Sequence, residues 1–477
     1  MNRKKITTGI SLVCAALSLF ACSLPVLVQK NQNQELPSAF GSKSDSASTA
    51  AQGWRAFFND ANLAALIDSA LANNQELNIV LQEIGMSENE IEARKGEYLP
   101  FVTLGGGMGI EKAARYTQLG ASEATTDIKP GKEMPEPLGD FKLGAYARWE
   151  ADIWHKLRNA RKAAVHRYLA SVEGRNFMVT NLVGEIATSY YELLALDNQL
   201  LIVEQNIGIQ QNALRMVKLQ KEATKVTELA VKRFEAQLLN TQSMQFEIRQ
   251  RIVETENRIN VLVGRFPQPV ERDHSSFSEL VPARIHTGTP AELLGNRADI
   301  RQAEQELAAA KLDIQVARAS FYPSLGLSAN FGIQAFNPAY LAKLPESLFS
   351  TLIGDMAGPI VNKKAIRAGY LNANARQIQA IYKYEQTVLN AFAEVVNQVS
   401  KIDNLERSYD MKSKEVNTLN ESVTISNRLF GSARADYTEV LLTQRDAIES
   451  RFELVETKMQ QLSAMVGAYR ALGGGWK

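Results

Sequence analysis

The chain contains few cysteines and histidines. Its 477 residues include two cysteines, at positions 14 and 22, and four histidines. The histidines are His155, His166, His274 and His286. Two cysteines cannot build a disulfide framework, and the histidines show no ligand-like clustering. We therefore expect neither a resident metal nor a bound cofactor.

The chain also lacks an excess of charge of either sign. It has 53 Lys and Arg residues against 52 Asp and Glu residues. Binding to the phosphates of a nucleic acid depends on an excess of basic side chains, so we expect no nucleic-acid partner. Because 45% of the residues are hydrophobic, a chain of this length can nevertheless bury a large core.

No recognisable catalytic motif is present. The sequence shows no Ser/His/Asp set, no phosphate-binding loop and no metal cluster. Two isolated glycine runs, 105–107 and 473–475, lack the spacing of a nucleotide-binding loop and are interpreted as strand packing and as the end of the chain. An enzyme is therefore disfavoured.

The first 22 residues have the pattern of an export signal. A basic start precedes the apolar run Ile10–Phe20, which is too short to span a membrane comfortably as a mature helix. The ending Leu-Phe-Ala-Cys (19–22) resembles the box of bacterial lipoproteins. The resemblance implies that residues 1–21 are removed and that Cys22 carries a covalent lipid. The alternative is an ordinary signal peptide cleaved nearby, and in both cases the protein leaves the cytoplasm.

Residues 22–52 are predicted to form an extended, lipidated tether. They are rich in Ser, Gln, Asn and Ala, a composition that does not favour a packed core. Ser23, next to the cysteine, is compatible with sorting of a lipoprotein to the outer membrane. Ordered structure is expected from about Trp54 onwards.

The remainder of the chain contains two similar halves. NNQELNIVLQEI (73–84) matches NRADIRQAEQEL (296–307), and IEARKGEYLP (91–100) matches IQVARASFYP (314–323) at the same offset. Self-similarity over long segments indicates an internal duplication. The chain therefore consists of two repeats of one structural plan.

The boundaries of the repeats follow from this duplication. VTELAV (226–231) also matches YTEVLL (437–442), at the smaller offset that a shorter loop in the second copy requires. We assign the first repeat to residues 53–264 and the second to 290–477. Residues 265–289 contain several prolines and no clear periodicity, so they are predicted to be the connector.

Each half contains two segments in which apolar residues recur at every second position. The clearest are FKLGAYARWEADI (141–153) and SLGLSANFGI (324–333). One side of the first carries Phe141, Leu143, Ala145, Ala147, Trp149, Ala151 and Ile153. The partner strands are expected at about 101–110 and 348–358, where the alternation is less regular. A period of two predicts β-strands with one apolar and one polar face.

Two very long helices are predicted after the strands. No proline interrupts the chain from Lys156 to about Gln220 or from Ala365 to about Phe430, so each helix could reach on the order of 90 Å. Apolar residues of the second helix recur at steps of four and three, at Val388, Phe392, Val395, Val399 and Ile402. This spacing is typical of a coiled-coil seam, and interspersed charges place the helices in water.

Strands and helices together predict a channel that several chains share. A membrane-spanning strand needs about 9 to 11 residues, and closed bacterial barrels begin at about eight strands. Each chain supplies only four, and open strand edges are not viable in lipid. The predicted fold class is a mixed α/β membrane protein. It comprises a trimeric, 12-stranded transmembrane β-barrel (four strands from each of three chains), continued by a long α-helical coiled-coil tunnel in the periplasm.

Four segments also resemble a known family. They are GWRAFFNDANLAALIDSALANNQELNI (53–79), WEADIWHKLRNARKAA (149–164), NRADIRQAEQELAAAKLDIQVARASFYPSL (296–325) and YRALGGGW (469–476). These segments are similar to the TolC-type outer-membrane efflux channels, the outer-membrane factors of tripartite efflux pumps. The resemblance extends from Cys22 to Trp476, although Ala298 stands where the family usually has proline.

This resemblance implies a function and partners. Members of the family are homotrimers in the outer membrane that extend into the periplasm and frequently carry a lipid anchor. They accept substrate from an inner-membrane transporter through a periplasmic adaptor protein. The chain would then be a passive exit duct for small molecules, such as drugs or metal ions. The alternatives are a protein secretion duct of the same architecture and a trimeric coiled-coil surface protein, which would not need amphipathic strands between its helices.

A candidate gate lies where each long helix turns back. TKVTELAV (224–231) and ARADYTEVLL (433–442) place Glu228 and Glu439 at equivalent positions of the two repeats. Two carboxylates from each of three chains would give six around the narrow periplasmic end. Like charges confined in a constriction favour cations.

Three further residues belong to this candidate gate. Glu439 aligns with an acidic gate position of the family, but the second acidic position, three residues further on, is Leu442 here. Arg434 and Tyr437 lie close enough in sequence to link neighbouring helices and hold the tip closed. The alternative interpretation is that all of these are solvated residues on an exposed helical turn.

Overall fold

The structure is a computed structural model, and it describes most of the chain. The described residues are 24–32, 36–40, 48–273, 277, 279–359, 363–432 and 434–476. The predicted signal peptide, residues 1–21, and the predicted lipidation site, Cys22, lie outside the described residues.

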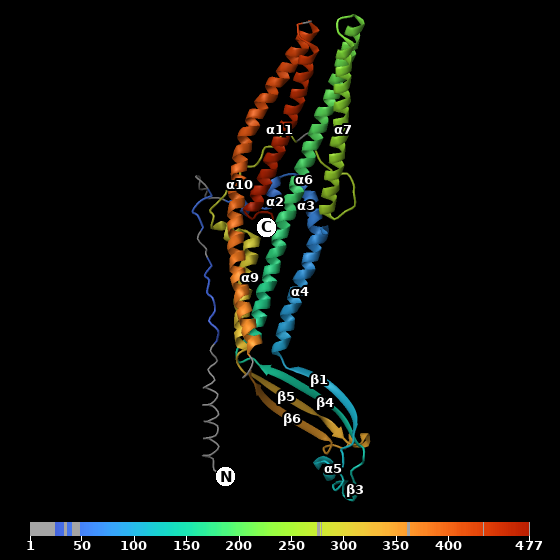
Figure 1. Ribbon diagram of the computed structural model, residues 1–477, viewed down its shortest axis with the longest axis vertical. Helices are drawn as coiled ribbons and strands as arrows, with labels where there is room; N and C mark the ends of the chain where they lie inside the picture. Colours follow the sequence, from blue (N-terminus) through green and yellow to red (C-terminus); the bar gives the residue numbers. More distant parts are fainter. Residues whose placement is uncertain are drawn as a thin grey trace. The chain divides into compact units, whose positions relative to one another are not determined.

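Both halves of the sequence contain the same order of elements (Figure 1). In the first half these are α4 (Gln75–Tyr98), β1 (Phe101–Glu111), β4 (Leu138–Ala151), α6 (Lys156–Glu222) and α7 (Glu228–Val263). In the second half they are α9 (Ala298–Ala319), β5 (Ser324–Ala335), β6 (Leu348–Ala357), α10 (Lys364–Gly431) and α11 (Tyr437–Ala471). The common plan of helix, two strands, very long helix and returning helix is therefore confirmed.

Shorter elements lie between these. The first helices along the described part of the chain are η1 (Thr49–Ala51), α2 (Trp54–Phe58) and α3 (Ala61–Asn73). The segment between β1 and β4 contains α5 (Gln118–Glu123), β2 (Asp127–Lys129) and β3 (Lys132–Glu133). The second half adds α8 (Glu292–Asn296) and η2 (Pro338–Tyr340).

The chain divides into two compact units, and each takes segments from both repeats. One unit contains the strands and comprises Met86–Tyr168 and Gln305–Ile381, together with the described residues 24–31. The other is helical and comprises Gln32–Gly85, Leu169–Glu304 and Tyr382–Lys477. The internal duplication is thus not a division into two spatial domains.

The four strands of the duplicated plan form one antiparallel sheet in the order β1-β4-β5-β6. The central pair, β4 with β5, joins the two halves of the sequence. The strands predicted at 101–110, 324–333 and 348–358 differ from β1, β5 and β6 by at most two residues at either end. The two edge strands, β1 and β6, each have only one neighbour in this sheet.

The strand predicted over 141–153 is displaced from the observed β4, which begins at Leu138 and ends at Ala151. Asp152 leaves the ladder because its carboxylate accepts backbone N–H groups at the start of α6, from Leu157 at 3.1 Å and Arg158 at 3.0 Å. Burial disfavours the charged form, but these N–H groups and the Arg158 guanidinium outweigh it, so the pKa of Asp152 lies below its usual range.

The two long helices agree with the prediction to within two residues. α6 has 67 residues and α10 has 68. On α10 the predicted seam faces the interior, with Val388 and Val395 buried and Phe392 and Val399 packed against the same cluster. Among the described residues, no helix is both long enough and apolar enough to cross a membrane.

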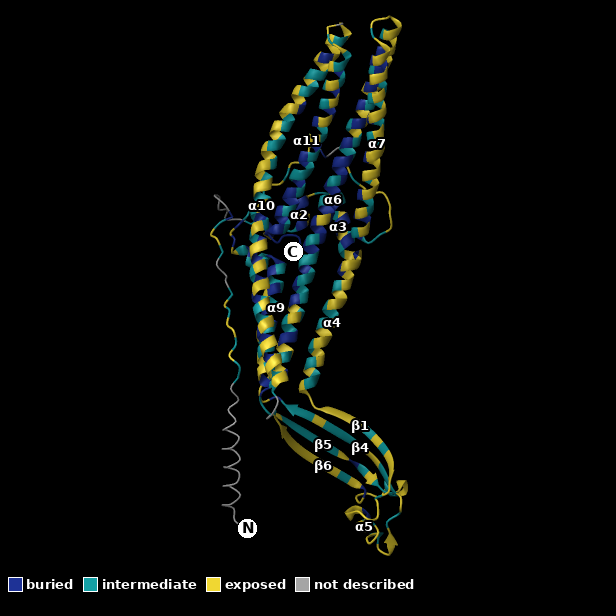
Figure 2. Ribbon diagram, in the orientation of Figure 1, coloured by how far each residue is buried: buried dark blue, intermediate teal, exposed yellow. Residues whose placement is uncertain are grey.

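The core of the helical unit lies where α2 and α3 meet α6, α7 and α11. Leu63, Ile67, Ile186 and Leu193 are fully buried there. Asp60 caps α3 by accepting the N–H of Leu63 at 2.9 Å. Buried residues occur along α6 and α11 in Figure 2, whereas the sheet is composed mostly of exposed and half-buried residues.

Candidate functional site

One face of the sheet is almost entirely apolar. The strand registers place Leu104, Ala145, Phe331 and Ser350 in one row and Val102, Ala147, Ala329 and Leu352 in the next. In the single chain the large side chains of these rows are exposed, with Leu104 86% and Leu352 78% exposed, whereas the three alanines are half-buried. Ser350 is the one polar member of these two rows. An apolar surface of this extent on a sheet fits contact with lipid.

The opposite face of the sheet is largely polar. One row runs across all four strands through Thr103, Tyr146, Asn330 and Thr351. The Asn330 amide donates to the Thr351 hydroxyl at 2.8 Å. Further along this face lie the charged residues Asp140, Lys142, Arg148, Glu150 and Asp355. The sheet therefore has the two-faced pattern that a wall between lipid and a water-filled duct requires.

Aromatic residues fix the junctions between strands and helices. The Trp149 indole donates to the carbonyl oxygen of Tyr98 at 2.9 Å, and the Trp154 indole donates to that of Pro323 at 2.7 Å. The rings of Trp154 and Tyr322 stack with centroids 4.6 Å apart. Amphipathic aromatic side chains at strand ends are typical of the membrane–water interface.

The first hairpin tip, between α6 and α7, carries Glu228. Thr224 adopts φ 57° after α6, and Thr227 caps α7 by accepting the N–H of Ala230. Glu228 is the first residue of α7 and forms an ion pair with Lys221 at the end of α6. The hydrogen bond from Lys221 lowers the pKa of Glu228. Its charge is thus partly balanced within its own hairpin.

The second hairpin tip, between α10 and α11, is built differently. Asp436 is the cap of α11 and accepts the N–H of Thr438, so Glu439 is the third residue of the helix. Glu439 is exposed and makes no ion pair within the described part of the chain. The two glutamates are equivalent in sequence, but the structure places them at different helical positions and in different electrostatic surroundings.

An apolar cluster joins the two tips, and the sequence patterns did not reveal it. It contains Leu214, Val217, Ala230, Val231, Phe234 and Val440, with Tyr437 and Phe430 packed against it. The rings of Phe234 and Phe430 have centroids 6.4 Å apart. The Phe234–Phe430 pair therefore links the two hairpins of one chain, and Tyr437 packs against the same cluster. The signal in the sequence that could have revealed this cluster is the pairs of apolar residues three positions apart, Leu214 with Val217 and Val231 with Phe234.

The remaining predicted gate residues lie at the surface of the second tip. Arg434 is exposed, and its backbone N–H donates to the carbonyl oxygen of Leu429 at 2.9 Å. Leu442 is 44% exposed, one turn beyond Glu439. The structure thus brings Glu439, Arg434, Tyr437 and Leu442 together at one tip and places Glu228 at the other.

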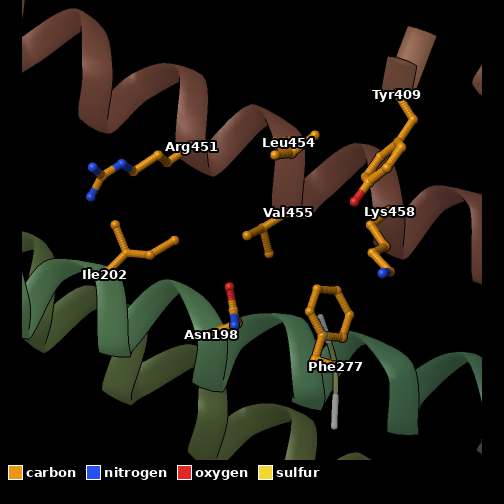
Figure 3. Close-up of a pocket in the computed structure, with 8 residues that line it drawn as sticks. All are labelled: Asn198, Ile202, Phe277, Tyr409, Arg451, Leu454, Val455 and Lys458. Atoms are coloured by element: carbon orange, nitrogen blue, oxygen red, sulfur yellow. The ribbon is translucent and has the colours of Figure 1, made fainter. Parts of the chain in front are cut away.

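A small pocket lies in the helical unit between α6 and α11 (Figure 3). Its volume is about 140 Å³, and it is lined by Asn198, Ile202, Phe277, Tyr409, Arg451, Leu454, Val455 and Lys458. Arg451 is held by Asn420, whose Oδ1 accepts from Nε at 2.9 Å. The Lys458 ammonium lies 5.7 Å from the centroid of the Tyr409 ring, and burial lowers the pKa of Lys458. None of these eight described residues is a serine, cysteine, histidine or carboxylate.

Relatives with known names match along almost the entire chain. The family model described as outer membrane efflux protein matches residues 66–265 and 289–474. The chain is 29% identical over 476 residues to the pyoverdine export outer membrane protein OpmQ of Pseudomonas aeruginosa, with 98% of this chain and 97% of OpmQ covered.

Two further matches extend this similarity. The chain is 25% identical over 469 residues to the cation efflux system protein CusC of Escherichia coli, with 97% of this chain and 98% of CusC covered. A crystal structure of CusC matches with a TM-score of 0.82 at 23% identity, covering 94% of this chain and 100% of that chain.

Proposed function

The chain belongs to the outer membrane efflux protein family, and from this premise we propose that it is the outer-membrane channel of a tripartite efflux system. In this role it is a passive exit duct that carries small molecules across the periplasm and the outer membrane. The observation that carries the proposal is the two-faced sheet, apolar on one side and polar on the other. A trimeric coiled-coil surface protein has no use for such a sheet.

The duct is proposed to be closed by three copies of the chain. A sheet of four strands leaves β1 and β6 with unpaired edges, and such edges are not tolerated in lipid. Pairing β6 of one protomer with β1 of the next satisfies both edges. Three protomers then give twelve strands, since each contributes four. The long helices of the three chains continue the duct into the periplasm.

The partners of this duct are a periplasmic adaptor and an inner-membrane transporter. Relatives with different cargoes, pyoverdine for OpmQ and cations for CusC, are similarly distant from this chain at 29% and 25% identity. Membership of the family therefore supports efflux of small molecules but does not identify which molecule this chain exports. A passive tube takes most of its selectivity from the transporter that feeds it.

The hairpin tips are proposed to be the periplasmic gate. In a trimer Glu228 and Glu439 supply two carboxylates per chain, hence six. Glu439 has the stronger influence in this proposal because Lys221 already balances the charge of Glu228. A ring of confined carboxylates favours cations, and the apolar cluster around Tyr437 holds the two hairpins of one chain together.

The lipid anchor at Cys22 is a separate proposal. It is tested by metabolic labelling with palmitate, which should tag the wild type and leave Cys22→Ser unlabelled. The Cys22→Ser variant should still assemble because the barrel itself anchors the protein in the membrane. Label that persists on the serine variant would disprove the anchor.

The efflux function is tested by cross-linking in living cells. A photoreactive residue at Leu442 should capture an adaptor, and affinity purification should recover a transporter with it. A matched residue on the apolar face of the sheet, at Leu104, should capture neither. Loss of the protein should also sensitise the cells to the transporter's cargo. A chain that captures no adaptor and whose loss changes no susceptibility would not be an efflux channel.

A further inference from the structure

A row of glycines crosses the polar face of the sheet. Gly105 on β1 pairs with Gly144 on β4, Gly144 pairs with Gly332 on β5, and Gly332 pairs with Phe349 on β6. Three neighbouring strands therefore lack side chains in this row. The result is a shallow groove in the wall with one aromatic residue at its end.

The Phe349 ring fills this groove. A Cβ atom placed on Gly332 would lie 2.9 Å from Cε1 of Phe349, and one placed on Gly144 would lie 3.2 Å from its Cζ. The ring therefore starts on β6, passes over β5 and reaches β4. Contact with two successive strands requires the ring to lie along the sheet rather than to stand away from it.

Tyr146 adopts a similar position in the adjacent row. A Cβ atom on Gly105 would lie 3.2 Å from Cε2 of Tyr146, so this ring leans from β4 towards β1. Both Phe349 and Tyr146 are half-buried, because one side of each ring rests on glycine and the other remains open. Two aromatic rings thus line the same face of one chain.

Resting on the proposed function, we propose that Phe349 and Tyr146 form a stacking surface in the duct for the planar aromatic parts of exported molecules. The polar face becomes the inner wall when the barrel closes, so the open sides of the rings face the passing cargo. Three chains supply three such surfaces at one level of the duct.

The chemistry of the rings defines the preferred ligand. A ring that lies along the wall offers its π-face, on which another planar ring stacks and towards which a cation is attracted. An aliphatic cation of similar size gains the second contribution but cannot stack. Planar aromatic cations should therefore be retained longest, and aliphatic ions should pass with little retention.

The test is block of single-channel current in planar bilayers by two probes. N-methylacridinium is a planar aromatic cation, and tetrapropylammonium is a cation without an aromatic ring. In the wild type the aromatic probe should block at lower concentration. Phe349→Ala should weaken its block by about three- to tenfold, the range expected for the loss of one aromatic contact. Phe349→Tyr should retain the block.

Two controls keep the result specific. Phe331→Ala removes a ring from the apolar face of β5, so it should leave the block unchanged. Phe349→Leu keeps an apolar side chain without a ring, so it should resemble Phe349→Ala. Equal block of wild type and Phe349→Ala by N-methylacridinium would overturn the stacking surface, as would an equal loss of block by tetrapropylammonium. A protein that forms no channel even when Arg434→Ala releases its tip would instead contradict the proposed function.

Discussion

The buried Arg297 forms an ion pair with the half-buried Glu394 in the helical unit, with Nη1 2.8 Å from Oε2. The same nitrogen donates to the carbonyl oxygen of Ala471 at 2.8 Å, and the other guanidinium nitrogens bind Asp299. The Arg297 side chain is only 7% exposed. One guanidinium thereby ties the start of α9 to α10 and to the end of α11.

Removal of this guanidinium should destabilise the fold strongly. Arg297→Met takes the buried guanidinium from two half-buried carboxylates, of which Glu394 keeps Arg470 as a partner. We therefore expect a loss near the lower end of the range for breaking a buried pair, about 3 kcal/mol. Thermal unfolding followed by circular dichroism should show the loss, and Arg297→Met with Glu394→Met should recover part of it. Arg445→Met, whose ion pair with Asp446 is exposed, should unfold like the wild type. If Arg297→Met and Arg445→Met unfold at the same temperature, Arg297 does not have this structural role.

Stability at acid pH should depend on Asp152. Its pKa is lowered in the folded chain, so the carboxylate stabilises the fold above its unfolded pKa of about 3.9, and this contribution disappears as the pH falls through the lower folded value. Asp152→Asn should remove that part of the pH dependence and be less stable at neutral pH. The measurement is the unfolding midpoint between pH 2 and pH 7. If the unfolding midpoints of Asp152→Asn and of the wild type change with pH in the same way, the Asp152 carboxylate makes no contribution to the pH dependence of stability.

The two faces of β5 should differ in their tolerance of charge. Leu327 lies on the apolar face and Ser328 on the polar face. Leu327→Arg should disrupt insertion at a cost of roughly 2–4 kcal/mol near mid-membrane, whereas Ser328→Arg should be tolerated in the duct. Folding into lipid vesicles, read by heat-modifiable migration on gels, compares the two. If both variants insert equally well, the strands do not separate lipid from water.

The hairpin tips should differ in their effect on ion preference. Glu439→Gln should reduce cation preference more than Glu228→Gln does, because Lys221 already balances Glu228. Arg434→Ala should raise the resting conductance if Arg434 holds the tip closed. Reversal potentials in a salt gradient give the preference for each variant. If all three variants keep the ion preference and the resting conductance of the wild type, the charged residues do not form the gate. The seal would then be formed by apolar residues such as Leu442.

The strands and long helices were predictable because their signals are local. A period of two marks Leu143, Ala145 and Ala147 as one face, and an absence of proline permits a helix as long as α6. The identical plan of both repeats strengthened each assignment. Sequence alone could also place Glu228 and Glu439 at equivalent positions of the two repeats, where each long helix turns back.

Features that depend on long-range contacts were not predictable. The glycine run at 473–475 carries no local signal of its packing, yet Gly473 has φ +90° and a Cβ there would lie 2.6 Å from the carbonyl oxygen of Asn296. Trp476 donates its indole N–H to that same oxygen at 3.1 Å. The contact between Phe234 of α7 and Phe430 of α10 is another example, since the two residues lie in different hairpins. No local pattern encodes such pairs.

The central claim is that several copies of a four-stranded sheet close into one duct. The most direct measurement is the mass of the purified particle in mild detergent, determined by sedimentation with detergent subtracted and followed by conductance in planar bilayers. We expect a particle of three chains with intact β-sheet signal that forms open channels when its tip is released by Arg434→Ala. A monodisperse single chain that retains its β-sheet and conducts no ions would contradict the claim.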